Sequence, residues 1–162
     1  MGLTLRSLAL AVGLLASTAA AQEATIAFGA LEQDTTLPVE VSADQLAVNN
    51  ADGSAVFTGN VVVTQGEMKL SAAEIKVKYA ADGKSIDQLI ASGGVLIANL
   101  GDAAEASEAI YTIASGVIVL TGDVLLTQGP STMAGQKLTI NLKDGTGIME
   151  GRVTTTFVPG GN

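Results

Sequence analysis

One short stretch occurs twice in this chain: residues 56–66 read VFTGNVVVTQG and residues 119–129 read VLTGDVLLTQG. Two weaker copies keep the central Gly-x-Val pattern, at Gly93–Val95 and at Gly151–Val153. A second motif alternates with the first and begins at Val41, Leu70, Ala104 and Met133. A repeat of roughly 30 residues strongly constrains the fold, because each unit must bury its apolar face against its neighbours.

Apolar residues recur at every second position within the copies. Phe57, Val61 and Val63 share one side of an extended chain. This period is typical of a half-buried strand. Asp-Gly pairs at 52–53, 82–83 and 144–145 favour tight hairpins, and residues 80–85 provide a turn for the extra length of the second unit. The sequence therefore predicts an all-β fold, either a sheet rolled on itself or a short solenoid, with a glycine bend in each copy.

The N-terminus has the pattern of a cleaved secretory signal. Arg6 precedes an apolar run, Leu8–Leu15, and Ala19–Ala21 offers a small-residue cleavage site. The apolar run is shorter than the roughly 20 residues that a membrane-spanning helix needs. We therefore predict export and four segments: a signal peptide (1–21), an N-terminal extension (22–37), a β-domain (38–159) and a short tail (160–162).

Composition argues against several classes of function. The chain has 16 acidic and 8 basic residues, a net charge of −8, which disfavours a nucleic-acid ligand. It has no cysteine and no histidine, so it lacks disulfides, the commonest general base and the commonest transition-metal ligand. The carboxylates Glu105, Glu108, Asp82 and Asp87 lack the dense spacing of a calcium loop. We expect no catalysis, no cofactor and no metal.

Several stretches resemble one family: Pro38–Asp44, Val56–Gly66, Leu70–Val77 and the closing run Arg152–Pro159. They resemble the LptA/OstA family of periplasmic lipopolysaccharide-transport proteins, from Pro38 to Pro159. The resemblance implies a repetitive antiparallel β-jellyroll, open at both ends, whose slot shields lipid acyl chains. It also implies three kinds of partner: lipopolysaccharide, further copies stacked head to tail, and inner- and outer-membrane components of the transport machinery.

The aliphatic positions of the repeat are candidates for the lining of such a slot. Each buried methylene of an acyl chain would contribute about 0.8 kcal/mol. The pattern by itself does not separate slot-lining residues from those of an ordinary core. The candidates are Val39, Val41, Leu46, Val48, Phe57, Val61, Val63, Leu70, Ile75, Val77, Val95, Ile97, Leu120, Val124, Leu126, Leu138 and Ile140.

Four lysines are candidate contacts for lipid headgroup phosphates: Lys69, Lys76, Lys78 and Lys84. The compact charge of a lysine suits a phosphate. Lys76 and Lys78, however, alternate with Ile75 and Val77, which favours a solvated outer face for these two side chains.

A rolled sheet that does not close leaves two unpaired edges. The first strand, at Val39–Val41, and the last, at Val153–Val158, would each accept a neighbouring copy if they face opposite ends. Alternatively, residues 22–37 or loops cover both edges. Two other functions stay open: a structural β-solenoid filament or envelope scaffold with a sealed core, and the membrane-anchored partner of the same pathway, which would keep residues 1–21.

Overall fold

The structure, a computed structural model, describes residues 24–27 and 32–158. Within these residues the chain forms one antiparallel sheet, which confirms the all-β prediction. The strands are β1 (Ala24–Ala27), β2 (Glu40–Ser42), β3 (Gln45–Asn49), β4 (Ser54–Gln65), β5 (Met68–Tyr79), β6 (Ile86–Asn99), β7 (Asp102–Thr112), β8 (Val117–Gln128), β9 (Ser131–Asn141), β10 (Thr146–Glu150) and β11 (Thr154–Thr156). No helix in the described residues has the length and apolarity to cross a membrane. The predicted signal peptide and tail lie outside the described residues.

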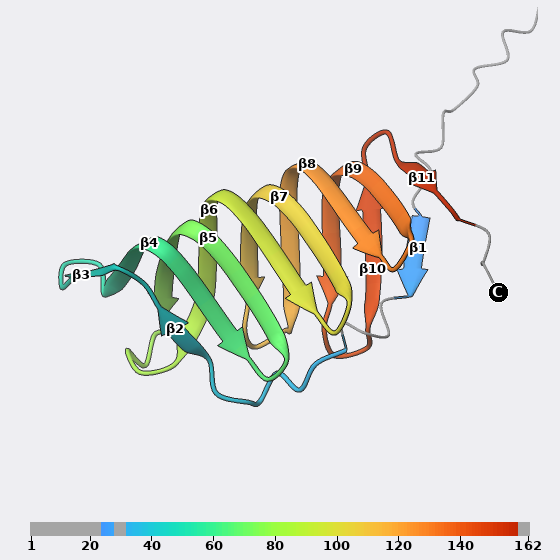
Figure 1. Ribbon diagram of the computed structural model, residues 1–162. Coiled ribbons are helices and arrows are strands. Elements are labelled where there is room, and N and C mark those ends of the chain that lie inside the picture. The colour runs from blue at the N-terminus through green and yellow to red at the C-terminus, as the bar shows by residue number, and fades with distance from the viewer. Residues whose placement is uncertain (1–23, 28–31, 159–162) are drawn as a thin grey trace, which may run out of the picture.

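The long strands β4 to β9 pair in sequence order, and each folds over at its middle (Figure 1). One half of every long strand therefore lies in one layer and the other half in a second layer. We call the layer that contains residues 54–58 of β4 layer A, and the layer that contains residues 61–65 layer B. At one end, β3 pairs with β4 in layer A and β2 pairs with β4 in layer B. At the other end, β10 and β11 divide β9 in the same way.

The fold-over, which we call the bend, lies at the repeated glycine. The four glycines share a φ of +80° to +84°, and they are Gly59, Gly93, Gly122 and Gly151. The residue after each glycine also has a positive φ, and at Gly59, Gly93 and Gly122 the register shifts in a β-bulge. Gly151 lies between β10 and β11. A Cβ on Gly122 would lie 2.7 Å from the Ser107 hydroxyl, and one on Gly59 would lie 2.6 Å from the Asp44 carboxylate. Only glycine fits, so the bend explains why the motif is repeated.

The close approach at the bend glycine also joins the two motifs of the repeat. The fourth residue of the first motif lies against the glycine of the second motif in every unit, and these residues are Asp44, Ala73, Ser107 and Gln136. In the first unit the backbone N–H of Asp44 also donates to the carbonyl of Gly59 at 2.9 Å. Each unit is therefore a pair of bent strands locked at one corner.

The predicted hairpins are confirmed. Residues 50–53 join β3 to β4, residues 80–85 join β5 to β6, and residues 142–145 join β9 to β10. In the second of these, the Asp82 carboxylate accepts hydrogen bonds from the backbone N–H groups of Lys84 and Ser85, both at 2.8 Å. Together with the Ser85 hydroxyl, these bonds lower the pKa of Asp82 to about 2.

The sheet begins before the boundary predicted at Pro38. β1 pairs with β10, with Ala24 opposite Met149 and Ala27 opposite Thr146. Residues 32–38 then run along the open side of the two layers toward β2 (Figure 1). A strand of four residues has too few positions to show a period of two, which is why the sequence did not reveal it.

Candidate functional site

The interior between the two layers holds most of the predicted lining residues. Twelve of them are at most 3 % exposed: Val61, Val63, Leu70, Ile75, Val77, Val95, Ile97, Leu120, Val124, Leu126, Leu138 and Ile140. Val39, Val41 and Phe57 are half-buried and pack against these. The two copies of the opening motif place Val61 and Val124 on the same inner face, as predicted. The repeat therefore builds a continuous aliphatic interior.

Leu46 and Val48 are different, with exposed fractions of 52 % and 65 %. Their register places them opposite Phe57 and Ala55, on the inner side of the sheet. Strand β3 projects at the end of the sheet, where β2 is only three residues long (Figure 1). The expectation that these two residues belong to the covered wall is not met, and they extend the inner surface beyond it.

Sequence reasoning missed other members of the interior. Besides several alanines, six large residues at 0 % exposure were missed: Met68, Leu89, Tyr111, Ile118, Leu142 and Met149. Extending the period of two backwards from Leu120 would have found Ile118. Extending it forwards from Leu138 and Ile140 would likewise have found Leu142, although that residue lies in the turn after β9.

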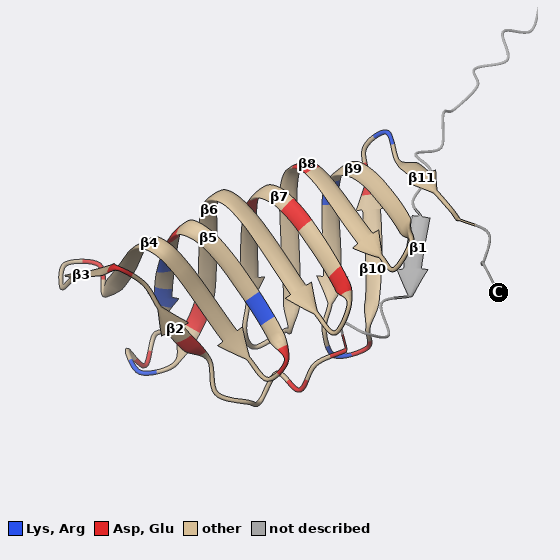
Figure 2. Ribbon diagram, in the orientation of Figure 1, with Lys and Arg blue, Asp and Glu red and all other residues tan. Residues whose placement is uncertain are grey.

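The four predicted headgroup lysines do not form one cluster (Figure 2). Lys69 lies on the layer B half of β5, whereas Lys76 and Lys78 lie on the layer A half. The Lys76 ammonium is 3.4 Å from the Asp52 carboxylate, and that of Lys78 is 3.5 Å from the Gln88 amide oxygen. Lys84 lies in the exposed turn after β5. Among these four, Lys69 also lines a cavity of about 380 Å³ beside Asn99.

The side of the molecule opposite the bend, which we call the seam, carries buried polar groups that the sequence did not reveal. There the Tyr111 hydroxyl of layer A donates a 2.7 Å hydrogen bond to the Gln65 side-chain oxygen of layer B. Burial raises the pKa of Tyr111 to about 12, and its hydrogen bond to Gln65 opposes that shift. Gln65 belongs to the repeated Thr-Gln-Gly sequence, which is the one signal that pointed to it.

Residues 32–38, which we call the strap, lie along the seam. The Gln65 amide nitrogen donates to the backbone carbonyls of Thr35 and Leu37, at 3.1 and 2.9 Å. The Gln33 side chain donates to the carbonyl of Gln65 at 2.6 Å, and its backbone N–H donates to the carbonyl of Leu142 at 2.8 Å. The strap is therefore bonded to both layers.

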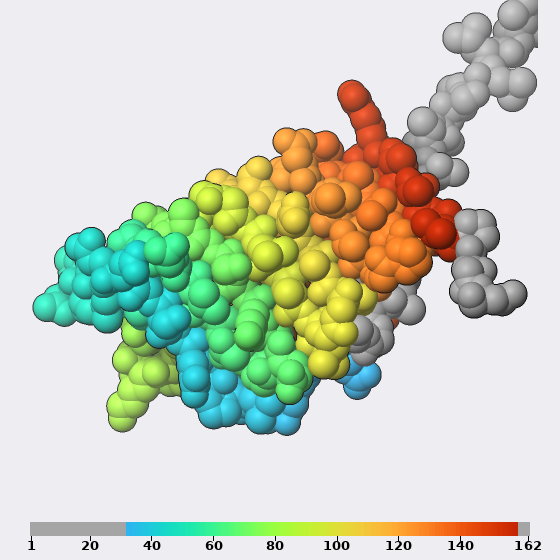
Figure 3. Space-filling model, viewed as in Figure 1, coloured from blue at the N-terminus to red at the C-terminus, as the bar shows by residue number. Residues whose placement is uncertain are grey.

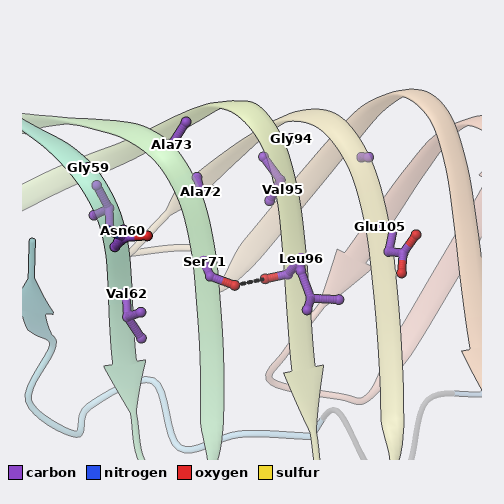
Figure 4. Close-up of a pocket in the computed structure, with 12 residues that line it drawn as sticks. Gly59, Asn60, Val62, Ser71, Ala72, Ala73, Gly94, Val95, Leu96 and Glu105 are labelled. Atoms are coloured by element: carbon purple, nitrogen blue, oxygen red, sulfur yellow. Dashed lines mark hydrogen bonds between the residues drawn. The ribbon is translucent and has the colours of Figure 1, made fainter.

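A cavity of about 690 Å³ lies near the bend, and its lining includes the interior residues Val61 and Val95 (Figure 4). Small residues such as Gly59 and Ala72 also line it, together with Leu96 and Glu105. The Ser71 hydroxyl, also in its lining, donates to the Leu96 carbonyl at 3.5 Å. Across residues 24–27 and 32–158, no three His, Cys, Asp or Glu side chains gather as metal ligands would.

Comparison with known proteins agrees with this architecture. A family model described as "LptA/(LptD N-terminal domain) LPS transport protein" matches residues 40–146. The chain is 32 % identical to the "Lipopolysaccharide export system protein LptA" of Escherichia coli K12 over 147 residues, 84 % of this chain and 79 % of that protein. It is 39 % identical over 54 residues to the "Lipopolysaccharide export system protein LptH" of Pseudomonas aeruginosa, which covers 33 % of this chain and 31 % of that protein.

The fold also matches a solved structure. The crystal structure of LptH from Pseudomonas aeruginosa, described as "the LptA homologous periplasmic component of the conserved lipopolysaccharide transport device", superposes with a TM-score of 0.69. The match covers 78 % of this chain and 99 % of that one at 21 % identity, and so it concerns the fold. Together with the match over residues 40–146, the repeat and the bent two-layer sheet lead to one conclusion: the chain belongs to the LptA/LptD N-terminal-domain family of LPS transport proteins.

Proposed function

We propose that this protein is a periplasmic lipopolysaccharide export component that carries the acyl chains of the lipid in its aliphatic interior. The observation that carries the proposal is the interior itself. It is continuous from β4 to β9, and the twelve predicted lining residues buried in it are Val, Leu or Ile, while β7 contributes alanines and Tyr111. Burial of each chain methylene contributes about 0.8 kcal/mol, so several acyl chains would be held without a specific hydrogen bond.

The interior of this structure is filled by its own side chains. Val61, Ile75 and Leu120, for example, are each 0 % exposed. Acyl chains would therefore enter by separating the two layers, because protein interiors are close-packed and leave no preformed space of that size. Headgroups would stay outside, where Lys69 lines the cavity beside Asn99.

We propose further that copies stack head to tail to link inner- and outer-membrane components of the transport machinery. β2 and β3 lie at one end of the sheet, and β1 and β11 lie at the other. The exposed inner-side residues Leu46 and Val48 supply an apolar surface at the first end. Contact between unlike ends does not close on itself and extends into a filament.

Photocrosslinking tests the lipid function. A photoreactive side chain at Val61 or Ile75 is expected to form an adduct with labelled lipopolysaccharide in cells. Val62 is the matched control, because it is the next residue of β4 and is only half-buried, whereas Val61 and Ile75 are fully buried. Ile75 is the cleaner inner position, since Val61 also lines the cavity near the bend. Adducts from Val62 but from neither inner position would contradict the proposal.

Sedimentation tests the stacking. Leu46→Asp places a charge on an exposed surface, so we expect an unchanged unfolding midpoint but a loss of oligomers, by at least tenfold in the association constant. The control is Leu100→Asp, a leucine in the loop after β6 that is more exposed than Leu46, at 74 %. Oligomers that persist in Leu46→Asp would show that this end is not the contact.

Two alternatives remain distinct. A structural filament with a sealed core is favoured by the close packing of the interior, and it predicts that solvent extraction of the purified protein yields no acyl chains. The membrane-anchored partner of the same pathway would retain residues 1–21, and the mass of the exported protein distinguishes it from a processed chain.

A further inference from the structure

The strap covers the seam with few contacts. Its residues are half-buried or exposed, and Leu37 at 40 % exposed is typical. The strap also contains a turn that is held by a bond within the strap: the Asp34 carboxylate accepts the backbone N–H of Thr36 at 2.9 Å. In Figure 3 the strap forms the lower edge of the molecule. A segment held by a few hydrogen bonds opens far more readily than a sheet does.

The polar groups beneath the strap are oriented toward it. The Tyr111 hydroxyl donates to the side-chain oxygen of Gln65, and the amide nitrogen of Gln65 faces the strap. That nitrogen donates to two backbone carbonyls, those of Thr35 and Leu37. The strap therefore presents carbonyl oxygens to a donor fixed at the mouth of an aliphatic interior.

Asn99 adds an amide without a partner. It is 2 % exposed, and neither its side-chain nitrogen nor its oxygen has a hydrogen-bond partner among the described residues. It lies near Gln65, because Gln65 pairs with Met68 and the pair Lys69–Ala98 sets Asn99 beside Met68. Buried polar groups in native proteins are almost always bonded, so an amide in this position suggests a partner in another state.

A lipid with acyl chains supplies that chemistry. With the chains between the layers, the junction to the headgroup would lie at the seam, because the bend is closed by continuous strands. Ester or amide carbonyls at the junction would accept from Gln65 as the strap carbonyls do now. A junction hydroxyl or amide N–H would donate to Asn99, whose own amide would donate in return.

We propose that the strap is a displaceable cover over a lateral entry to the interior. Gln65 beneath the strap and Asn99, two strands away in layer B, bind the carbonyl junction between acyl chains and headgroup. Tyr111 positions Gln65 and does not itself meet the lipid. The proposal rests on the lipid-binding function proposed above.

A disulfide tests the cover. A Cβ on Gly116 would lie 3.1 Å from the Thr35 Cγ2, an atom bonded to the Thr35 Cβ. The two positions are therefore neighbours, as a disulfide with its Cβ atoms about 3.8 Å apart requires. The chain has no cysteine of its own, so Thr35→Cys with Gly116→Cys creates one defined bond in the full chain. We expect the oxidised variant to retain at least tenfold less lipopolysaccharide than the same sample after reduction.

The controls separate the two proposals. Each single cysteine variant, in particular Gly116→Cys at its φ of +70°, shows whether the substitution alone affects binding. Equal retention by the oxidised and reduced forms would overturn the cover and leave lipid binding standing. No retention by the wild-type chain would overturn both.

Asn99→Ala tests the junction site. We expect lipopolysaccharide retention to fall by at least threefold while the unfolding midpoint stays the same or rises, because a buried unpaired amide is removed. Gln88→Ala is the matched control: this amide is on the same strand, but it is half-buried and bonded to Thr112 at 3.3 Å. Unchanged retention in Asn99→Ala would contradict the assignment of the junction to this site.

Discussion

The bend and the seam are the two long sides of the same two-layer sheet, and they are built in opposite ways. At the bend every long strand passes from one layer to the other, and a Cβ on Gly122 would lie 2.7 Å from Ser107. At the seam the layers are joined by side chains such as Tyr111 and Gln65 and by the strap. One side is fixed by backbone geometry, and the other is held by hydrogen bonds.

This difference bears on how the interior opens. Separating the layers at the bend would require breaking strands out of a continuous ladder. Separating them at the seam costs a small number of hydrogen bonds, each with a net contribution of about 0.5–1.5 kcal/mol. The two layers are therefore expected to part at the seam while the bend acts as a hinge.

The largest effect is expected at the bend. Gly122→Ala introduces a Cβ into the space of the Ser107 side chain at a φ of +84°. We expect it to lower the free energy of unfolding by about 3 kcal/mol or more, measured by urea denaturation.

Gly129→Ala is the control for this substitution. Gly129 also has a positive φ, +53°, but nothing lies within 4 Å of the added Cβ. We expect a cost of about 1 kcal/mol from backbone strain alone. Equal costs at the two sites would show that the close approach at the bend is not what fixes it.

A smaller effect is expected at the seam, and it depends on pH. Burial raises the pKa of Tyr111 from 10.0 to about 12, so above pH 10 the unfolded chain releases a proton that the folded chain keeps. The contribution of neutral Tyr111 to the free energy of unfolding is complete below pH 10 and is lost as the pH rises through about 12. One unit of pKa corresponds to about 1.4 kcal/mol, and we expect the free energy of unfolding to fall by about 2–3 kcal/mol over this range.

Tyr111→Phe isolates that contribution. At pH 8 it leaves the buried Gln65 oxygen without its 2.7 Å partner and should cost about 1–2 kcal/mol. Above pH 10 its unfolding free energy should fall less steeply than that of the wild type, because the variant lacks the hydroxyl proton that Tyr111 keeps in the folded chain. Parallel curves for the two proteins would mean that Tyr111 does not hold the seam.

Periodicity was sufficient to predict the inner face. The alternation around Val61 and Val124 identified strands, and the repeat identified their glycine bends. It could not show what lies opposite a strand. Leu46 has the same parity as the buried residues and is 52 % exposed, because cover depends on the length of a partner strand.

The seam could not be predicted for a different reason. Tyr111 and Gln65 are distant in sequence and meet only because two layers face each other. Asn99 is a polar residue at an inner position, which periodicity treats as an exception. Long-range polar contacts leave no local pattern in a sequence, whereas a bend that only glycine permits does.

The bend, which recurs in every repeat unit, also determines which dimension of the interior would grow if a unit were added. Each unit adds two bent strands, and neighbouring strands lie about 4.8 Å apart, so a duplicated unit would lengthen the interior by about 10 Å. Its width would stay the same, because the position of the glycine fixes how much of each strand enters each layer. The length of the interior is thus set by the number of repeat units, and a chain with one more unit would have a longer aliphatic interior of unchanged depth.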